Sequence, residues 1–307
     1  MKVTFAVASY NSGKYLEECV NSALAQNDID CEVVIVDDGS SDGSDLLAER
    51  MAQADPRIRF FRTPSNRGPG GARNIALEQM QGDWYAVLDS DDLLEPDRSA
   101  RLIAAAQAHN AQMVADDLQL FGEGMETTQF LENSSLPDTV LSLEAYFRDS
   151  AMYGPAPNPG FLKPMIARSL IEQTGIRYDE TLRVAEDDDL IIRLLMHGAR
   201  YYVAAQAGYR YRKHEQSISH RLSPKHAAAM GARAQSLEKE VLKAGLDSAA
   251  FQKRQKAMRQ AVAFTMAIEA LKNRKPMTAL SEVAKEPGSA RHFAMPIKAR
   301  IARLLGG

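Results

Sequence analysis

The sequence has few of the features that mark secreted, fibrous or membrane-spanning chains. Its 307 residues include only two cysteines, Cys19 and Cys31, too few for a disulfide framework, which predicts two buried thiols in a reducing compartment. No run approaches the ~20 apolar residues that a membrane span needs, and the longest candidate near the C-terminus, 261–268, is far too short. Hydrophobic residues make up 45% and charged residues 25%, as in globular proteins.

Two N-terminal signals are also missing. The chain begins with an apolar segment, 3–8, without a basic leader or cleavage site, so we expect a first strand and a cytoplasmic protein with at most peripheral membrane contact. That segment is followed by Ser9-Tyr10-Asn11 and not by Gly-x-Gly-x-x-Gly. The absence of this glycine pattern argues against a dinucleotide-dependent dehydrogenase.

Charge is divided unevenly along the chain. Residues 1–220 hold 20 basic and 34 acidic side chains, a formal charge of -14, whereas residues 221–307 hold 17 basic and 6 acidic side chains, a charge of +11. Such a division predicts two regions with different partners. We place a domain at 1–220, with halves 1–115 and 116–220, and a basic helical region at 221–307.

Strand and helix patterns alternate over the first 115 residues. Apolar runs predict strands at 3–9, 32–36, 58–61, 84–88 and 112–115. Helical periodicity predicts helices at 13–26, 42–53, 71–80 and 96–109. This alternation is typical of βαβ units and predicts an α/β fold with a mostly parallel, Rossmann-like sheet flanked by helices.

The pattern loosens from 121 to 164, a stretch rich in glycine, proline, serine and asparagine that is typical of a binding loop. Beyond it we expect helices at 165–174 and 188–197, short strands at 201–204 and 208–212, and long helices at 225–243 and 248–272.

An acidic turn follows the second expected strand. It reads Asp37-Asp38-Gly39 and leads into serines and a helix. In open α/β sheets, ligands bind at the carboxyl ends of the strands. Asp38 could therefore accept a hydrogen bond from a nucleotide base, while Gly39 lets the backbone turn tightly. The alternative is a turn that only caps the next helix.

A second acidic motif, Asp89-Ser90-Asp91-Asp92, follows the strand expected at 84–88. Carboxylates one residue apart can converge on Mg²⁺ or Mn²⁺, which take such oxygens together with substrate phosphates. The alternative is a solvated acidic turn, but its position directly after a buried strand favours a site.

Three further segments carry charge. Arg73 lies in a glycine-rich segment before a helix, where backbone N–H groups and a guanidinium can meet a phosphate; alternatively it is a surface arginine. Residues 186–189 are acidic and precede a helix, so they either cap it or supply a general base. The segment 209–217, with Arg212 and His214, could close over a diphosphate or form a solvated edge strand.

In this order the motifs resemble those of the family-2 inverting glycosyltransferases, which have the A-type nucleotide-diphospho-sugar transferase fold. The resemblance covers residues 1–220. It implies metal ligation by Asp91 and His214, and a base supplied by Asp187 with Glu186 beside it. The residues that it implies for nucleotide binding are Ser9, Tyr10, Asn11, Asp38, Gly39, Arg73, Asn74, Asp89, Ser90 and Arg212.

The resemblance predicts a metal-dependent inverting transferase that uses Mn²⁺ or Mg²⁺. We expect it to move a sugar from a nucleotide-diphospho-sugar, preferably a UDP-sugar, to a saccharide or lipid-linked saccharide in surface polysaccharide synthesis. The alternatives are a nucleotidyltransferase, whose N-terminal phosphate loop is missing here, and a noncatalytic sugar-nucleotide-binding module. Nucleic acid is not an expected partner, because residues 1–220 are acidic and no nucleic-acid motif is recognisable.

The C-terminal segment 291–305 alternates basic and apolar residues. A helix from Pro296 would place Ile297, Ile301, Leu304 and Leu305 on one face, with basic residues off that face. Such a helix can lie in an anionic membrane surface on the inner face of the cell membrane. Alternatively it packs on the catalytic domain or forms a homodimer contact.

Overall fold

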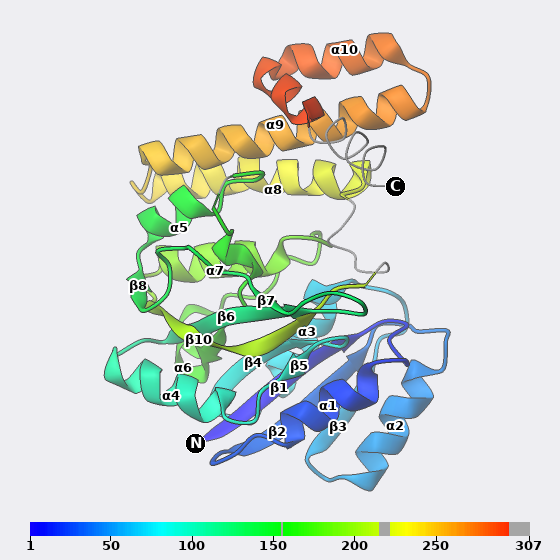
Figure 1. Cartoon of the computed structure of the whole chain (residues 1–307), viewed down its shortest axis with the longest axis vertical. Coiled ribbons are helices and arrows are strands. Elements are labelled where there is room, and N and C mark those ends of the chain that lie inside the picture. The colour runs from blue at the N-terminus through cyan, green and yellow to red at the C-terminus, as the bar shows by residue number, and fades with distance from the viewer. Residues whose placement is uncertain (155, 215–221, 295–307) are drawn as a thin grey trace. The chain divides into compact units, whose positions relative to one another are not determined.

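The computed structural model describes residues 1–154, 156–214 and 222–294 (Figure 1). The tail helix expected from Pro296 lies outside these residues. Of the described residues, 1–146 and 159–214 form one compact unit, and 147–154, 156–158 and 222–294 form another. Cys19 and Cys31 are free, buried thiols, as the sequence predicts.

The first unit is built on a ten-stranded sheet of order β3-β2-β1-β4-β9-β6-β10-β5, with β7 paired to β6 and β8 to β10. The strands are β1 (Lys2–Ser9), β2 (Asp30–Asp37), β3 (Ile58–Arg62), β4 (Trp84–Asp89), β5 (Leu93–Leu94), β6 (Met113–Phe121), β7 (Thr128–Gln129), β8 (Thr139–Leu141), β9 (Met165–Ala167) and β10 (Tyr201–Arg212). The helices are α1 (Leu16–Leu24), α2 (Ser44–Ala54), α3 (Pro69–Gln79), α4 (Arg98–Ala108), α6 (Arg168–Thr174) and α7 (Glu186–Met196), and η1 is a short turn (Pro159–Phe161).

The expected α/β fold, with a sheet flanked by helices, is confirmed. Strands β1 to β4 pair in parallel where they are neighbours, and β6 pairs in parallel with β10. Helices α1, α2 and α3 pack against β1 to β3 (Figure 1). Because both faces are covered, the central strands are apolar nearly throughout their length.

The sheet departs from the expected pattern in two ways: it is mixed, because β5, β7, β8 and β9 pair antiparallel with their neighbours, and two expected strands are joined into one. The helix expected at 165–174 is preceded by β9, which runs antiparallel to both β4 and β6. Three apolar residues are too few to show the alternation of a strand, so periodicity merges them with the helix. The two strands expected at 201–204 and 208–212 form one strand, β10, with a register shift between Ala204 and Tyr209.

The strand register brings the predicted motifs together. Ser9, at the end of β1, is paired with Asp37 at the end of β2, and Ala8 is paired with Asp89 at the end of β4. The loops that follow these strands therefore leave the sheet side by side at its carboxyl edge, where α/β proteins bind ligands.

A buried ion pair joins α4 to β6 near this edge. Arg98 and Asp116 are fully buried, and the guanidinium donates two hydrogen bonds to one carboxylate oxygen, from Nε at 3.0 Å and from Nη2 at 2.8 Å. Gly208 lies against the pair: a Cβ there would be 2.8 Å from the Asp116 carboxylate and 2.9 Å from the Arg98 side chain. Glycine at 208 is thus what allows β10 to pass so close to the pair.

The second unit is helical, as expected for the basic region. Its elements are α8 (Pro224–Lys243), α9 (Ala249–Lys272), α10 (Pro276–Lys285) and the turn η3 (Pro287–Phe293). Ser223 and Ser248 cap α8 and α9, each accepting a hydrogen bond from a backbone N–H three residues on. The segment 147–158, which includes the end of α5 (Leu143–Asp149), joins this unit through Phe147, whose ring is 4.9 Å from that of Phe251.

Within the parts of the chain that the structure describes, every helix is too short or too polar to cross a membrane.

Candidate active site

The loops after β1 and β2 are joined by hydrogen bonds. Asn11 has left-handed backbone geometry, with φ of 51°, and accepts a hydrogen bond from the N–H of Ser41 at 2.9 Å. Its own N–H donates to Ser40 Oγ at 2.9 Å. Tyr10 and Asn11 are exposed and have surface open to a ligand, whereas Ser9 is buried.

Asp38 holds the loop that leads into α3. Its carboxylate is buried and accepts hydrogen bonds from the backbone N–H of Arg67 at 2.7 Å and of Gly68 at 2.6 Å, and from Thr63 Oγ1 at 3.0 Å. Gly39 has φ of 80°, the turn for which the sequence predicted glycine. The structure thus gives Asp38 a role in shaping the loop before α3, and the base contact that the sequence predicted stays a prediction.

The loop after β4 presents Asp91 to the end of β10. Oδ2 of Asp91 and Nε2 of His214 lie 2.7 Å apart. Ser90 is half-buried beside it. Asp92 points inward and accepts hydrogen bonds from the hydroxyl of Tyr209 at 2.8 Å and from the N–H at the end of β10. Burial raises the pKa of Asp92 well above its usual value, and the neighbouring carboxylates raise it further.

Arg212 supports this loop from β10. Its guanidinium donates to the backbone carbonyl of Asp91 at 2.7 Å and to the Glu18 carboxylate at 2.5 Å. It lies over the rings of Tyr15 and Phe121, 4.7 and 4.6 Å from their centroids. These protein groups bond the Arg212 guanidinium in the structure, and the nucleotide contact that the sequence predicted for it stays a prediction.

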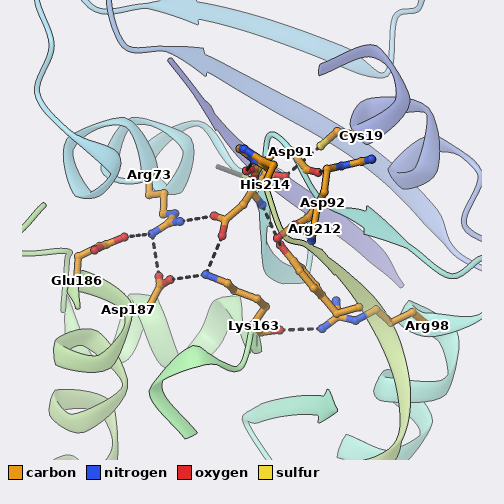
Figure 2. Close-up of polar contacts among 12 residues, drawn as sticks. Cys19, Arg73, Asp91, Asp92, Arg98, Lys163, Glu186, Asp187, Arg212 and His214 are labelled. Atoms are coloured by element: carbon orange, nitrogen blue, oxygen red, sulfur yellow. Dashed lines mark hydrogen bonds and ion pairs between the residues drawn. The ribbon is translucent and has the colours of Figure 1, made fainter. Parts of the chain in front are cut away.

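Five charged side chains form a closed network between β4, α3 and α7 (Figure 2). Arg73 donates to Glu186 at 2.6 Å and to Asp187 at 3.0 Å through Nη1, and to Asp89 at 2.6 Å through Nη2. Lys163 Nζ lies 2.9 Å from the other oxygen of Asp89 and 3.1 Å from the other oxygen of Asp187. The two cations therefore join the same two aspartates in a ring, with Glu186 attached at Arg73.

Burial and charge act against each other in this network. Burial would raise the pKa of Asp89, but Lys163 and Arg73 hold it well below its usual value. Burial would lower the pKa of Lys163, but Asp89 and Asp187 raise it above its usual value. The pKa of Glu186 is raised by burial, against the opposing effect of Arg73. Lys163 and Asp89 therefore stay charged at neutral pH.

The residues before α7 are positioned by α3. Asn74 donates to the carbonyl of Tyr178 at 3.1 Å, accepts from the N–H of Tyr178 at 2.8 Å, and donates to Glu180 at 3.1 Å. Asn74 thus holds the chain that leads into α7, although the sequence predicted it as a nucleotide ligand. The acidic residues 186–189 are all buried and form the first turn of α7, where they also suit the helix dipole. Arg73 is buried as well, which excludes a surface arginine.

Lys163 is the member of the network that sequence reasoning missed. It comes from the irregular stretch before β9, where no motif singles it out. Its backbone carbonyl accepts a hydrogen bond from Arg98 Nη2 at 2.7 Å, which ties it to the buried pair with Asp116 (Figure 2). The only sequence signal is a lysine directly before a proline that precedes an apolar run, and this signal is too common to identify a site.

Asp91 and His214 are the groups suited to a divalent cation. Among the described residues, no group of three or more histidine, cysteine, aspartate or glutamate side chains is arranged to hold a metal ion. Asp91 and His214 are hydrogen-bonded to each other at 2.7 Å, and the Asp91 carboxylate is the oxygen ligand that Mn²⁺ or Mg²⁺ prefers; these ions commonly complete their coordination with substrate phosphates and water. The donor set at this loop is therefore compatible with a cation that arrives with a diphosphate.

The comparisons with known proteins identify the family. The model of "Glycosyl transferase family 2" matches residues 4–172, more than half of the chain. This chain belongs to glycosyl transferase family 2. The finding confirms the resemblance drawn from the motifs and favours a transferase over a nucleotidyltransferase or a noncatalytic module.

Two curated relatives come from Rhizobium meliloti (strain 1021). The chain is 38% identical over 303 residues to the succinoglycan biosynthesis protein ExoO. The alignment covers 98% of this chain and 86% of ExoO. It is 33% identical over 214 residues to the succinoglycan biosynthesis protein ExoU, covering 67% of this chain and 60% of that protein.

Solved structures share the fold. S. aureus TarS in complex with UDP aligns with a TM-score of 0.58 at 22% identity, over 88% of this chain and 72% of that chain. The mannosyltransferase PcManGT from Pyrobaculum calidifontis, in complex with GDP-Man and Mn²⁺, aligns with a TM-score of 0.55 at 19% identity, over 98% and 80%.

Proposed function

We propose that this transferase moves a sugar from a nucleotide-diphospho-sugar, with UDP as the preferred nucleotide, to a saccharide or lipid-linked saccharide acceptor in surface polysaccharide synthesis. The observation that carries the proposal is the arrangement at the end of β4, where Asp91 meets His214 and Asp89 meets the cluster of Arg73 and Asp187. The succinoglycan names of the two relatives support the polysaccharide role, and the UDP and GDP-Man complexes of the solved structures support the donor class.

In this proposal, the open surface at Tyr10 and Asn11 and the loop shaped by Asp38 receive the nucleoside. Arg73, in the second turn of α3, is the cation assigned to the donor diphosphate, and its guanidinium would exchange a carboxylate partner for the diphosphate when the donor binds. Asp91 and His214 would hold a divalent cation, which when bound neutralises charge on the leaving diphosphate.

Asp187 is the proposed general base. It takes the proton of the acceptor hydroxyl as the hydroxyl oxygen attacks the anomeric carbon from the face opposite the diphosphate. The bond from that carbon to the diphosphate oxygen breaks, and its electron pair leaves with the nucleotide. A single displacement of this kind inverts the configuration at the anomeric carbon and needs no covalent intermediate on the enzyme. Glu186, the neighbouring buried carboxylate, is the competing candidate for the base.

The direct test is nucleotide release from a panel of UDP-glucose, UDP-galactose, UDP-N-acetylglucosamine and GDP-mannose, with and without Mn²⁺. We expect one UDP-sugar to give the fastest release and chelation of the metal to suppress it. Release from GDP-mannose alone would change the nucleotide assignment, and equal release with and without metal would contradict the metal dependence. No release from any donor would contradict the proposed donor class.

A peripheral membrane contact through the basic tail remains part of the proposal, from the sequence alone. Each basic residue close to an anionic surface contributes about 1 kcal/mol. We expect full-length protein to co-sediment with anionic but not neutral liposomes, and a truncation after Ser289 to lose this binding. Salt should weaken it. Equal recovery of both proteins with anionic vesicles would contradict the contact and leave packing on the catalytic domain or a homodimer contact for the tail.

A further inference from the structure

Lys163 has no role in the transfer described so far, although it is buried in the centre of the site. Its ammonium contacts two carboxylates, one of which is the proposed base. The network contains three carboxylates, Asp89, Glu186 and Asp187, against two cations. Removing either cation would enlarge the surplus of negative charge where a diphosphate must approach, so each cation has an electrostatic reason to be present.

The two cations differ in how they hold Asp187. Each oxygen of this carboxylate has its own partner, Oδ1 facing Arg73 and Oδ2 facing Lys163. In the proposed function Arg73 serves the donor diphosphate, and its fork has few N–H groups to spare for carboxylates at that moment. Lys163 would then be the remaining partner that fixes the orientation of Asp187.

A second layer fixes Lys163 itself. Arg98 Nη2 donates both to Asp116 at 2.8 Å and to the carbonyl of Lys163 at 2.7 Å. Both partners of this ion pair are fully buried, so the free energy lost by removing the charges from water offsets much of their attraction. Well-packed apolar side chains often stabilise a fold equally well. The pair is better explained by its hydrogen bond to Lys163, which places the lysine backbone relative to the sheet.

We propose that Lys163 is a positioning residue for the transfer: it holds the Asp187 carboxylate in the orientation in which it accepts the acceptor proton, and the Arg98–Asp116 pair places Lys163. This inference rests on the proposed function, in which Asp187 is the base. It differs from a direct role of Lys163 in binding the diphosphate, because a lysine that acts through Asp187 affects turnover and leaves nucleotide affinity intact.

The experiment compares Lys163→Met, which removes the charge and keeps the length of the side chain, with Lys163→Arg, which keeps the charge. Nucleotide release from the best donor of the panel and titration of UDP with Mn²⁺ are measured for each. We expect Lys163→Met to lower kcat by about 10²-fold, as a misplaced catalytic group does, with UDP affinity unchanged within about threefold. Lys163→Arg should recover much of the turnover.

The deciding measurement is a double-mutant cycle with Asp187→Asn. If Lys163 acts through Asp187, adding Lys163→Met to Asp187→Asn should cost less than about threefold, because the group being positioned has already lost its function. Fully additive losses would overturn the proposal, and so would a loss of UDP affinity with kcat retained, which would make Lys163 a diphosphate ligand.

Lys2→Met is the matched control. Lys2 forms an ion pair with the buried Glu32 at 2.9 Å, but at the opposite end of β1 from Ser9. Its loss should lower the melting temperature without changing kcat; an equal fall of kcat in Lys2→Met would show that loss of stability alone explains the effect. If Lys163→Met does not fold, Lys163→Gln keeps a hydrogen-bond donor without the charge and takes its place in the cycle.

Crystal structures of the lysine variants supply a readout that needs no donor. A rotated or displaced Asp187 carboxylate supports the proposal, and an unchanged carboxylate contradicts it. Failure of the proposed function is distinguishable: full turnover in Asp187→Asn would remove the base assignment and the role of Lys163 with it. Loss of turnover in Asp187→Asn together with full turnover in Lys163→Met would overturn the role of Lys163 alone.

Discussion

Replacing Asp91 with alanine is expected to lower transfer by about 10³-fold or more and to abolish Mn²⁺-dependent binding of UDP. The reason is that Asp91 supplies the carboxylate of the two-residue donor set at the end of β4 and lies 2.7 Å from its partner, His214. An imidazole alone is a weak holder of a hard cation that prefers oxygen ligands. Isothermal titration of UDP, with and without Mn²⁺, measures the loss directly.

The control for this variant is Asp97→Ala. Asp97 is exposed, stands just before α4 and forms only a surface ion pair with Arg101, one turn along the helix, so its loss should leave both turnover and metal-dependent binding as they are. Unchanged metal-dependent UDP affinity in Asp91→Ala would show that Asp91 is not the metal ligand.

Asp187→Asn keeps the shape of the side chain and removes its ability to take a proton. Turnover should fall by about 10²–10⁴-fold, the usual cost of losing a general base, while UDP binding persists. The amide also leaves Arg73 and Lys163 with less negative charge between them, so a lower melting temperature is expected alongside the kinetic loss. Steady-state nucleotide release and UDP titration separate the two effects.

Two variants in the same turn of α7 test whether the loss of turnover belongs to the Asp187 carboxylate and not to a neighbouring one. Asp188→Asn changes the next carboxylate of α7, which accepts a hydrogen bond from the Tyr146 hydroxyl at 2.9 Å. It should keep most of the turnover. Wild-type transfer in Asp187→Asn together with loss of transfer in Glu186→Gln would instead identify Glu186 as the base.

The sequence predicted the site best where acidic side chains directly follow a predicted strand. Asp89 and Asp91 directly follow a continuous apolar strand, and parallel pairing then brings them beside the ends of β1 and β2. That argument needs only local patterns and one rule about parallel sheets. The short strands β5, β7, β8 and β9 could not be predicted, because two or three residues show no periodicity and their pairing depends on partners far along the chain.

The same limit explains why the protein partners of two predicted nucleotide ligands could not be predicted from the sequence. Arg212 and Asn74 have the residue types of nucleotide ligands, but their partners in the fold are protein groups. Lys163 had no motif at all, since its partners Asp89 and Asp187 are 74 and 24 positions away. A side chain whose role comes from tertiary contacts of this kind leaves no signature in the neighbouring sequence.

Residues 147–158 belong to the helical unit, although they lie within the sequence of the first unit. The chain therefore cannot be separated into its two units by a single cut. A gene fragment cut after 217 would still encode this segment but not the helices it packs with, so Phe147 and Ser150 would lose Phe251 and Arg254 as neighbours. A fragment without those helices would therefore expose Phe147, which is buried in the whole chain. Exchange of the C-terminal helices for those of another protein would likewise have to preserve their contacts with this segment.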